Sequence, residues 1–143
     1  MACTRGKPKS TFLLGLVALA FLVAGIGTGA ARGDATRNVG PGEAQALIRE
    51  NAGKKDFVVL DVRTPGEFTR GHLEGAVLVD YRSPGFRKEL ESQDRTKTYL
   101  VYCRTGNRSG GALKIMKELG FRSYYHLEGG IKMWQEEGFP VVR

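Results

Sequence analysis

Cysteine is scarce in this 143-residue chain, which holds only Cys3 and Cys103. Two cysteines are too few for a small secreted domain held together by disulfides. No group of cysteine, histidine or carboxylate residues has the spacing of metal ligands, so we expect no metal. The sequence also lacks internal repeats and low-complexity tracts, and 41% of its residues are hydrophobic, which excludes a disordered or collagen-like chain.

Acidic residues are in deficit, with 15 against 22 lysines and arginines, and none precedes Asp34. The formal net charge of +7 falls to +4 when Arg5, Lys7 and Lys9, which precede an apolar run, are removed. A charge of +4 is a weak indication of nucleic-acid binding, and it fits a small anionic substrate equally well. We therefore expect no nucleic-acid partner.

The first 31 residues have the pattern of a secretory signal peptide. A basic start is followed by the uncharged run 11–26, and Thr28 and Ala30 then suit a cleavage site after Ala30. Left uncleaved, residues 11–26 would anchor the chain in a membrane. Either way we expect an exported protein, in the periplasm. Cleavage would leave Cys103 as the only thiol, either buried and inert or kept for its reactivity.

Residues 32–37 read as a linker, and residues 38–143 as one domain in which short strands alternate with helices. The ranges expected as strands are 38–39, 57–62, 76–80, 98–102 and 123–126. The ranges expected as helices are 42–51, 64–68, 84–90, 109–119 and 130–137. This alternation predicts an α/β fold, a mostly parallel sheet with helices on both faces. Ligands bind such sheets beyond the carboxyl ends of the strands.

One of those strand ends carries Cys103, followed by the polar loop residues Arg104, Thr105, Gly106, Asn107 and Arg108 and by Ser109, which is expected to open a helix. A tight loop of this kind can turn several amides inward to hold an anion. The helix N-terminus and two arginines add positive charge, so we expect a lowered pKa for the Cys103 thiol. The alternative is a buried, inert cysteine.

Three segments resemble the single-domain rhodaneses, which are thiosulfate sulfurtransferase-like modules. They are LDVRTPGEFTRGHLEGA at 60–76, YCRTGNRSGGA at 102–112 and LEGGIKMWQEEGFPV at 127–141. The resemblance covers about residues 38–143 and implies a five-stranded rhodanese-like sheet. It also implies that Cys103 accepts a sulfane sulfur as a persulfide and needs no cofactor. The implied partners are a small anionic sulfur donor, such as thiosulfate, and a thiol or cyanide acceptor.

Two other functions remain open on this fold. Cys103 to Arg108 make a six-residue loop, the length found in the sulfurtransferases, whereas the related phosphatases and arsenate reductases use seven residues. The loop therefore favours sulfur transfer over cysteine-dependent phosphatase or arsenate reductase chemistry. Rhodanese-like modules can also serve in interactions, and an exported carrier that delivers persulfide to a protein partner would have the same sequence.

Four residues outside the loop are candidates for supporting roles. Asp61 ends a strand near Cys103, where it would hold loop groups or pair with Arg63 rather than act as a base. Arg63 and Glu67 are four residues apart around a short helix and could also pair with each other. His72 is either a general base for Cys103 or a histidine that holds the fold, as its position in the family indicates.

Two dipeptides with basic side chains follow the strand expected at 76–80. They are Tyr81-Arg82 and Arg87-Lys88. Each is either solvated surface or part of a loop that faces the substrate, because the carboxyl end of that strand lies at the same edge as Cys103.

Overall fold

The computed structural model describes residues 36–143, so the expected signal peptide and residues 32–35 of the expected linker lie outside the described residues. The strands are β1 (Thr36–Val39), β2 (Phe57–Asp61), β3 (Val77–Leu78), β4 (Thr98–Tyr102) and β5 (Ser123–Leu127). The helices are α1 (Pro41–Glu50), α2 (Pro65–Thr69), α3 (Phe86–Glu91), α4 (Asn107–Glu118) and α5 (Gly130–Glu136).

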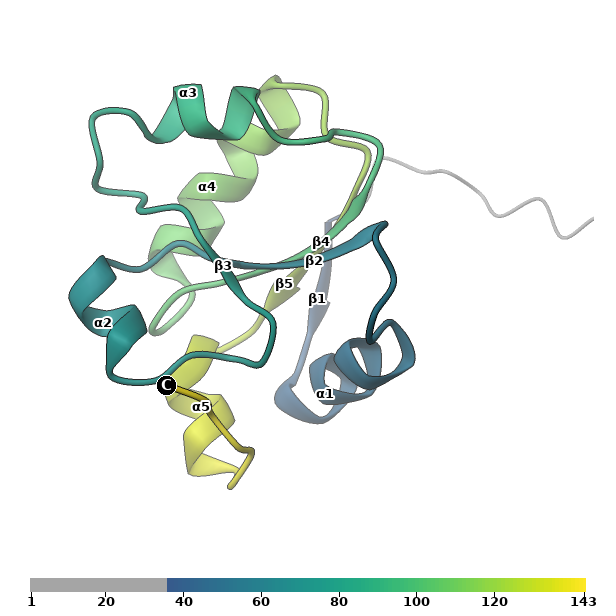
Figure 1. Cartoon of the computed structure of the whole chain (residues 1–143), viewed down its shortest axis with the longest axis vertical. Helices are drawn as coiled ribbons and strands as arrows, with labels where there is room; N and C mark the ends of the chain where they lie inside the picture. The colour runs from purple at the N-terminus through teal and green to yellow at the C-terminus, as the bar shows by residue number, and fades with distance from the viewer. Residues whose placement is uncertain (1–35) are drawn as a thin grey trace, which may run out of the picture. The chain divides into compact units, whose positions relative to one another are not determined.

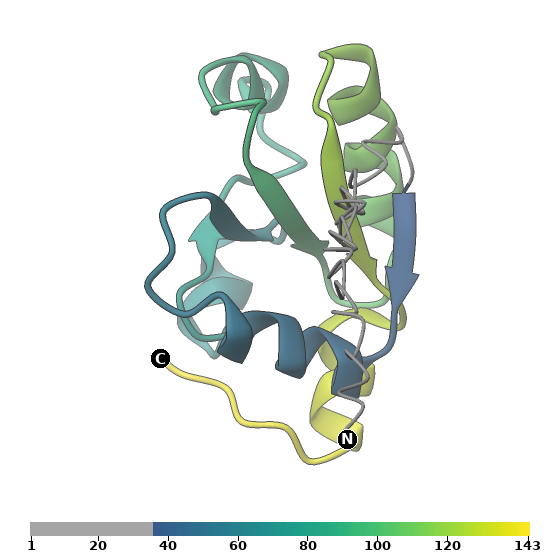
Figure 2. The same ribbon diagram turned by 90° about the vertical axis from the view of Figure 1, so that its right-hand side faces the viewer.

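The five strands form one sheet in the order β1-β5-β4-β2-β3, and every pairing is parallel. The arrowheads of β1, β4 and β5 point the same way in Figure 2. The register places Asp61 of β2 beside Tyr102 of β4, so the residues that follow these two strands meet at one edge. This sheet confirms the predicted α/β fold.

Helices cover both faces of the sheet (Figure 1). On one face, α3 and α4 bury apolar side chains such as Leu90 and Met116 against the sheet. On the other face, α1 and α5 contribute Ala44, Ile131 and Trp134 to a second cluster. The sheet is therefore buried on both sides, which accounts for the continuous apolar runs of β2 and β4.

Several element boundaries differ from those expected. Helix α4 begins at Asn107 instead of Ser109, because Gly106 takes a left-handed conformation (φ 103°) and its carbonyl accepts from the Gly110 amide. The strand expected at 76–80 shortens to β3, which lies at the sheet edge and pairs with β2 alone. Helix α3 starts two residues late, because a turn joins the Phe86 amide to the Ser83 carbonyl.

Candidate active site

Cys103 follows β4 directly and lies on the floor of the loop that leads into α4. It is 1% exposed and has a free thiol. The Gly106 amide donates to its Sγ at 3.1 Å, and the Ser109 hydroxyl lies 3.4 Å from the same atom. Gly106 supplies that amide from a backbone conformation (φ 103°) that other residues rarely adopt. The loop thus surrounds one sulfur atom with hydrogen-bond donors.

These donors favour the Cys103 thiolate. Burial raises the pKa of the thiol, but hydrogen bonds from the Ser109 hydroxyl and from the amides of Ser109, Thr105 and Gly106 outweigh burial. The pKa of Cys103 therefore lies below its ordinary value, as the sequence predicted. The loop amides contribute as expected, the Ser109 hydroxyl contributes more than any one of them, and the loop arginines are not among the main causes.

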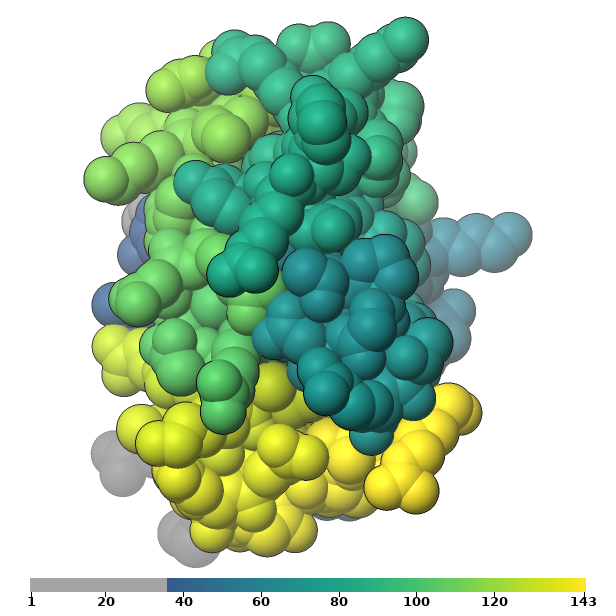
Figure 3. Space-filling model, turned by 90° about the vertical axis from the view of Figure 1, so that its left-hand side faces the viewer, coloured from purple at the N-terminus to yellow at the C-terminus, as the bar shows by residue number. Residues whose placement is uncertain are grey.

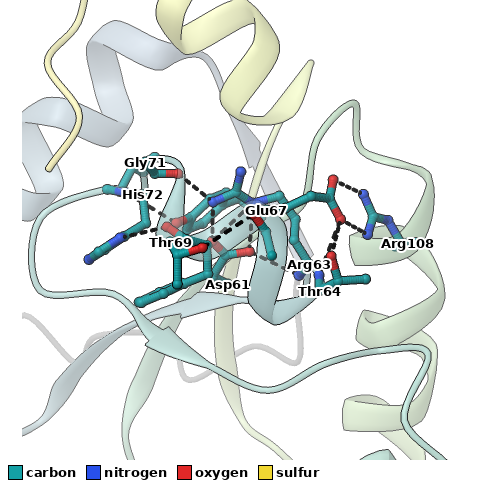
Figure 4. A network of polar contacts seen from close by, with 12 residues as sticks. Asp61, Arg63, Thr64, Glu67, Thr69, Gly71, His72 and Arg108 are labelled. Carbon is teal, nitrogen blue, oxygen red and sulfur yellow. Dashed lines mark hydrogen bonds and ion pairs between the residues drawn. The ribbon is translucent and has the colours of Figure 1, made fainter. Parts of the chain in front are cut away.

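The guanidinium of Arg108 forms its ion pair with Glu67 and no hydrogen bond with the Cys103 sulfur. Two hydrogen bonds join the guanidinium to the carboxylate, at 2.7 and 2.8 Å, and both side chains are largely buried. These bonds lower the pKa of Glu67 to about 2. Glu67 also accepts from the amide and hydroxyl of Thr64, the residue that caps α2 (Figure 4). Glu67 thereby ties α2 to the first turn of α4.

The expected alternative, a pair between Arg63 and Glu67, is wrong. Arg63 instead binds Asp61, whose two oxygens accept from its Nε and Nη2 at 2.6 to 3.0 Å. Both side chains are buried, and the second guanidinium contact is the carbonyl of Gly71. A buried carboxylate needs a partner at close range, and Arg63 provides it for Asp61, whereas Glu67 pairs with Arg108. The pair with Asp61 was the other expectation, and it is confirmed.

His72 makes contacts that stabilise the fold, with Phe68 and with the C-terminal segment at Val142. Its Nδ1 lies 3.0 Å from the carbonyl of Phe68, and its ring stacks on the Phe68 ring with centroids 3.7 Å apart. Its backbone exchanges two hydrogen bonds with Val142, at 2.9 Å each. These contacts agree with a structural histidine, and none of them joins its ring to Cys103.

The histidine next to the loop is His126 of β5, which was not among the predicted site residues. Its Nε2 lies 2.8 Å from the Ser109 hydroxyl, and its Nδ1 lies 3.3 Å from Oδ1 of Asn38. Burial lowers the pKa of His126, and the Gly106 carbonyl and Glu128 oppose it only in part. The pairing of β5 with β4 places His126 beside Val101, two residues before Cys103, and no local motif in the sequence indicates this position.

The segment that begins at Gly129-Gly130 packs against the backbone of the loop. The amides of Ile131 and Lys132 in α5 donate to the carbonyls of Cys103 and Arg104, at 2.9 and 3.0 Å. A Cβ on Gly130 would lie 2.4 Å from the Cys103 carbonyl oxygen, so only glycine permits this approach. The third motif therefore fixes the backbone at the start of the loop from Cys103 to Arg108.

The loop residues divide into two groups. Cys103, Gly106 and Ser109, together with the Thr105 amide, surround the sulfur. Arg104, Thr105 and Asn107 are exposed at the rim, and Arg104 and Arg108 line an open pocket of about 480 Å³. Within residues 36–143, no group of three or more histidine, cysteine or carboxylate residues could hold a metal. No helix in that range is long and apolar enough to cross a membrane.

Proteins of known structure share this fold. A solved rhodanese-related protein of Thermoplasma volcanium is 35% identical, with a TM-score of 0.61, over 74% of this chain and 97% of that one. A solved protein of Rhodopseudomonas palustris, described as a possible tyrosine phosphatase, is 28% identical, with a TM-score of 0.59, over 75% of this chain and 85% of that one.

Two curated relatives are sulfurtransferases. The thiosulfate sulfurtransferase GlpE of Pseudomonas fluorescens is 31% identical over 69% of this chain and 84% of its own length. The sulfurtransferase of Allochromatium vinosum is 29% identical over 70% of this chain and 92% of its own length.

Other relatives are longer. The match to a Synechocystis protein, slr1261, is 34% identical and covers 73% of this chain but only 55% of that protein. The model of the rhodanese-like domain family matches residues 43–137, which is well over half of the chain. The chain therefore belongs to the rhodanese-like domain family.

Proposed function

We propose that this protein transfers a sulfane sulfur from thiosulfate, or a related donor, to a thiophilic acceptor through a persulfide on Cys103. The observation that carries the proposal is the position of Cys103 Sγ, which lies 3.1 Å from the Gly106 amide on the floor of the loop. A buried sulfur with a lowered pKa and converging donors is prepared as a nucleophile.

The first half of the reaction needs the Cys103 thiolate. It attacks the outer sulfur of thiosulfate, the bond to the sulfonate sulfur breaks, and that bonding pair leaves with sulfite. A monoanion and a dianion enter, and the persulfide anion and the sulfite dianion result, so charge balances. The amides of Thr105 and Gly106 then face the new anion, which is stabilisation of the oxyanion-hole type.

The second half returns the enzyme to its starting state. A thiolate or cyanide attacks the outer sulfur of the persulfide, and the Cys103 thiolate leaves. Ser109 is placed to stabilise that leaving thiolate, because its hydroxyl lies 3.4 Å from Sγ. The hydroxyl has one hydrogen and also lies 3.0 Å from the Gly106 carbonyl, so it donates either to that carbonyl or to the sulfur. Both arrangements require that Nε2 of His126, 2.8 Å away, carries a proton and donates to the Ser109 oxygen.

Phosphatase chemistry fits the same loop less well. A phosphate ester requires donors for three equatorial oxygens around phosphorus. The six-residue loop from Cys103 to Arg108 closes its amides on a single sulfur atom, and both hydrogen bonds of Arg108 go to Glu67. We therefore place sulfur transfer before phosphate or arsenate chemistry.

A dedicated sulfur carrier is the remaining alternative, in which one protein partner takes the sulfur from Cys103. Thiocyanate production from thiosulfate and cyanide distinguishes an enzyme from such a carrier. We expect steady turnover by the wild type and none by Cys103→Ser, since no other cysteine lies in residues 36–143. Turnover by the Cys103→Ser variant would exclude the persulfide mechanism, and a single turnover by the wild type would indicate a carrier.

We further propose that the protein acts outside the cytoplasm. Support comes from the sequence alone, in the basic start, the uncharged run 11–26 and the small residues Thr28 and Ala30. N-terminal sequencing of exported protein is expected to begin near Ala31 or Arg32. A start at Met1 or Ala2 in membranes would indicate an anchor, and protein confined to the cytoplasm would contradict both forms.

A further inference from the structure

An open pocket of about 480 Å³ lies beside the catalytic loop. Its lining comes from α2 and the residues on either side of it, from the loop after β3, from the loop between Cys103 and Arg108, and from α5. The lining residues are Arg63, Glu67, Arg70, Gly71, Arg82, Arg104, Arg108 and Gln135. Figure 3 shows the face of the molecule on which these segments come together.

The pocket carries a surplus of positive charge. Five of its lining residues are arginines, and Glu67 is the single carboxylate among them. Arg63 is paired with the buried Asp61, and Arg108 is paired with Glu67. The guanidinium groups of Arg70, Arg82 and Arg104 have no ion pair or side-chain hydrogen bond within the described part of the chain, residues 36–143. Three fixed cations are thus free to bind a ligand.

The size of the pocket indicates more than an inorganic anion. Pockets of about 300–1,000 Å³ hold small organic molecules, whereas thiosulfate has only two sulfur and three oxygen atoms. The free arginines also come from three separate segments, so they can contact charges at separate points of one ligand. A guanidinium binds a carboxylate through two parallel hydrogen bonds, which makes carboxylates well suited to these positions.

We propose that this pocket binds an organic thiol carrying at least two carboxylates, and that Arg70 and Arg82 select it as the sulfur acceptor. The proposal rests on the persulfide mechanism given above. The acceptor thiolate attacks the outer sulfur, the Cys103 thiolate leaves, and the product is the organic persulfide anion. Two anions enter and two result, and no oxidant or reductant is required.

The arginines of the two dipeptides after β3, Arg82 and Arg87, have different surroundings, and the difference fits this assignment. Arg82 lines the pocket, whereas Arg87 pairs with Glu118 of α4 at 2.9 Å and with Glu91 at 3.6 Å. The surface ion pairs of Arg87 fit the prediction of solvated surface, whereas the position of Arg82 in the pocket fits the prediction of a loop that faces the substrate. Of these two arginines, Arg82 is the one without an ion pair in residues 36–143, so it can bind a ligand.

The test isolates the acceptor half of the reaction. Protein loaded with one sulfur by thiosulfate, and freed of thiosulfate and sulfite, is mixed with three thiols that differ in carboxylate number. They are 2-mercaptoethanol, 3-mercaptopropionate and mercaptosuccinate, with none, one and two. The second-order rate of sulfur loss from Cys103 is measured for the wild type, Arg70→Gln, Arg82→Gln and the double variant.

The expected result is a change in selectivity. We expect each single variant to lower the ratio of the mercaptosuccinate rate to the 2-mercaptoethanol rate about tenfold, the range of one charged hydrogen-bonded contact. Comparing each thiol with itself across variants removes its intrinsic reactivity. The matched control is Arg122→Gln, an exposed arginine at the amino end of β5, which should leave the ratio unchanged.

Two failures are distinguishable. If the wild type takes no sulfur from thiosulfate on Cys103, the proposed function itself fails. If sulfur is loaded and removed, but the ratio is the same in the wild type, Arg70→Gln and Arg82→Gln, the mechanism stands and the assignment of the pocket is overturned. An equal fall of the ratio in Arg122→Gln would also overturn it, because net charge and not the pocket would then set the selectivity.

Discussion

Arg108, the last residue of the six-residue loop, forms two hydrogen bonds with Glu67, which lies 41 residues earlier in α2. The pair is 16% and 18% exposed, so solvent screens it far less than a surface ion pair. This pair therefore connects helix α2 to the first turn of α4, and it lies at the end of the loop that runs from Cys103 to Arg108. The loop keeps its shape because its far end is fixed.

The stability of this ion pair depends on pH. The hydrogen bonds from Arg108 lower the pKa of Glu67 from 4.5 to about 2 in the folded protein. A carboxyl group with a lower pKa in the folded state stabilises the protein fully above pH 4.5, and this stabilisation is lost as the pH falls toward 2. We expect Glu67→Gln to lower the free energy of unfolding near neutral pH by on the order of 1–3 kcal/mol, and to lower it less in acid.

Denaturant unfolding of both proteins between about pH 7 and pH 2 measures this difference. The control is Glu118→Gln, which removes the exposed pair with Arg87 and should cost no more than about 0.5 kcal/mol. A difference between wild type and Glu67→Gln that stays constant with pH would contradict the role of the ion pair.

Ser109 is expected to set the reactivity of Cys103. Its hydroxyl is the strongest of the groups that lower the pKa of the thiol against the effect of burial. Replacing it in Ser109→Ala should raise that pKa, because the thiolate loses a hydrogen bond that favours its charged form. The measurement is the pH dependence of Cys103 alkylation by iodoacetamide.

The matched control for this variant is Ser123→Ala, which removes a hydroxyl bonded to Thr98 at the amino end of the sheet. It should leave the alkylation midpoint where the wild type has it. Identical midpoints in the wild type and Ser109→Ala would show that the amides alone stabilise the thiolate.

Gly130 is expected to tolerate no side chain. In Gly130→Ala, the new Cβ would lie 2.4 Å from the Cys103 carbonyl oxygen, at a backbone φ of 58°. We expect the free energy of unfolding to fall by about 2–4 kcal/mol and sulfur transfer to fall at least tenfold, because the loop backbone must move. Gly110→Ala in α4 is the control, since its Cβ would meet nothing within 4 Å. Equal activity in Gly130→Ala and Gly110→Ala would contradict this role for α5.

Loop length is expected to limit the reaction to sulfur. The wild type should release no phenol from an aryl phosphate through Cys103. A glycine inserted between Gly106 and Asn107 should lower thiocyanate production at least tenfold, because it moves the Gly106 amide from its position 3.1 Å from Sγ. Hydrolysis of the aryl phosphate by the wild type, at the rate of thiosulfate turnover, would favour the phosphatase assignment instead.

The sequence predicted the parts of this site that depend on local order. Alternating short strands and helices predicted the parallel sheet, and the polar loop after a buried strand placed Cys103 at its carboxyl edge. The pairing of Asp61 with Arg63 was also foreseeable, because the two residues leave the same strand end.

Contacts between distant segments could not be predicted in the same way. The Glu67–Arg108 pair requires the placement of α2 against α4, which neither segment encodes by itself. His126 reaches Ser109 only through the register of β5 beside β4. Arg104 was predicted as a loop residue and Arg82 as either surface or substrate-facing, but nothing in the sequence indicated that Arg70 would join them in one pocket.

The central claim is that Cys103 carries the transferred sulfur, and intact-mass spectrometry tests it most directly. The purified protein is weighed before and after thiosulfate, and again after cyanide, alongside Cys103→Ser. We predict that the wild type gains the mass of one sulfur atom, that a fragment containing Cys103 carries it, and that cyanide removes it. A wild type of unchanged mass with its thiol reduced, or an equal gain in Cys103→Ser, would contradict the claim.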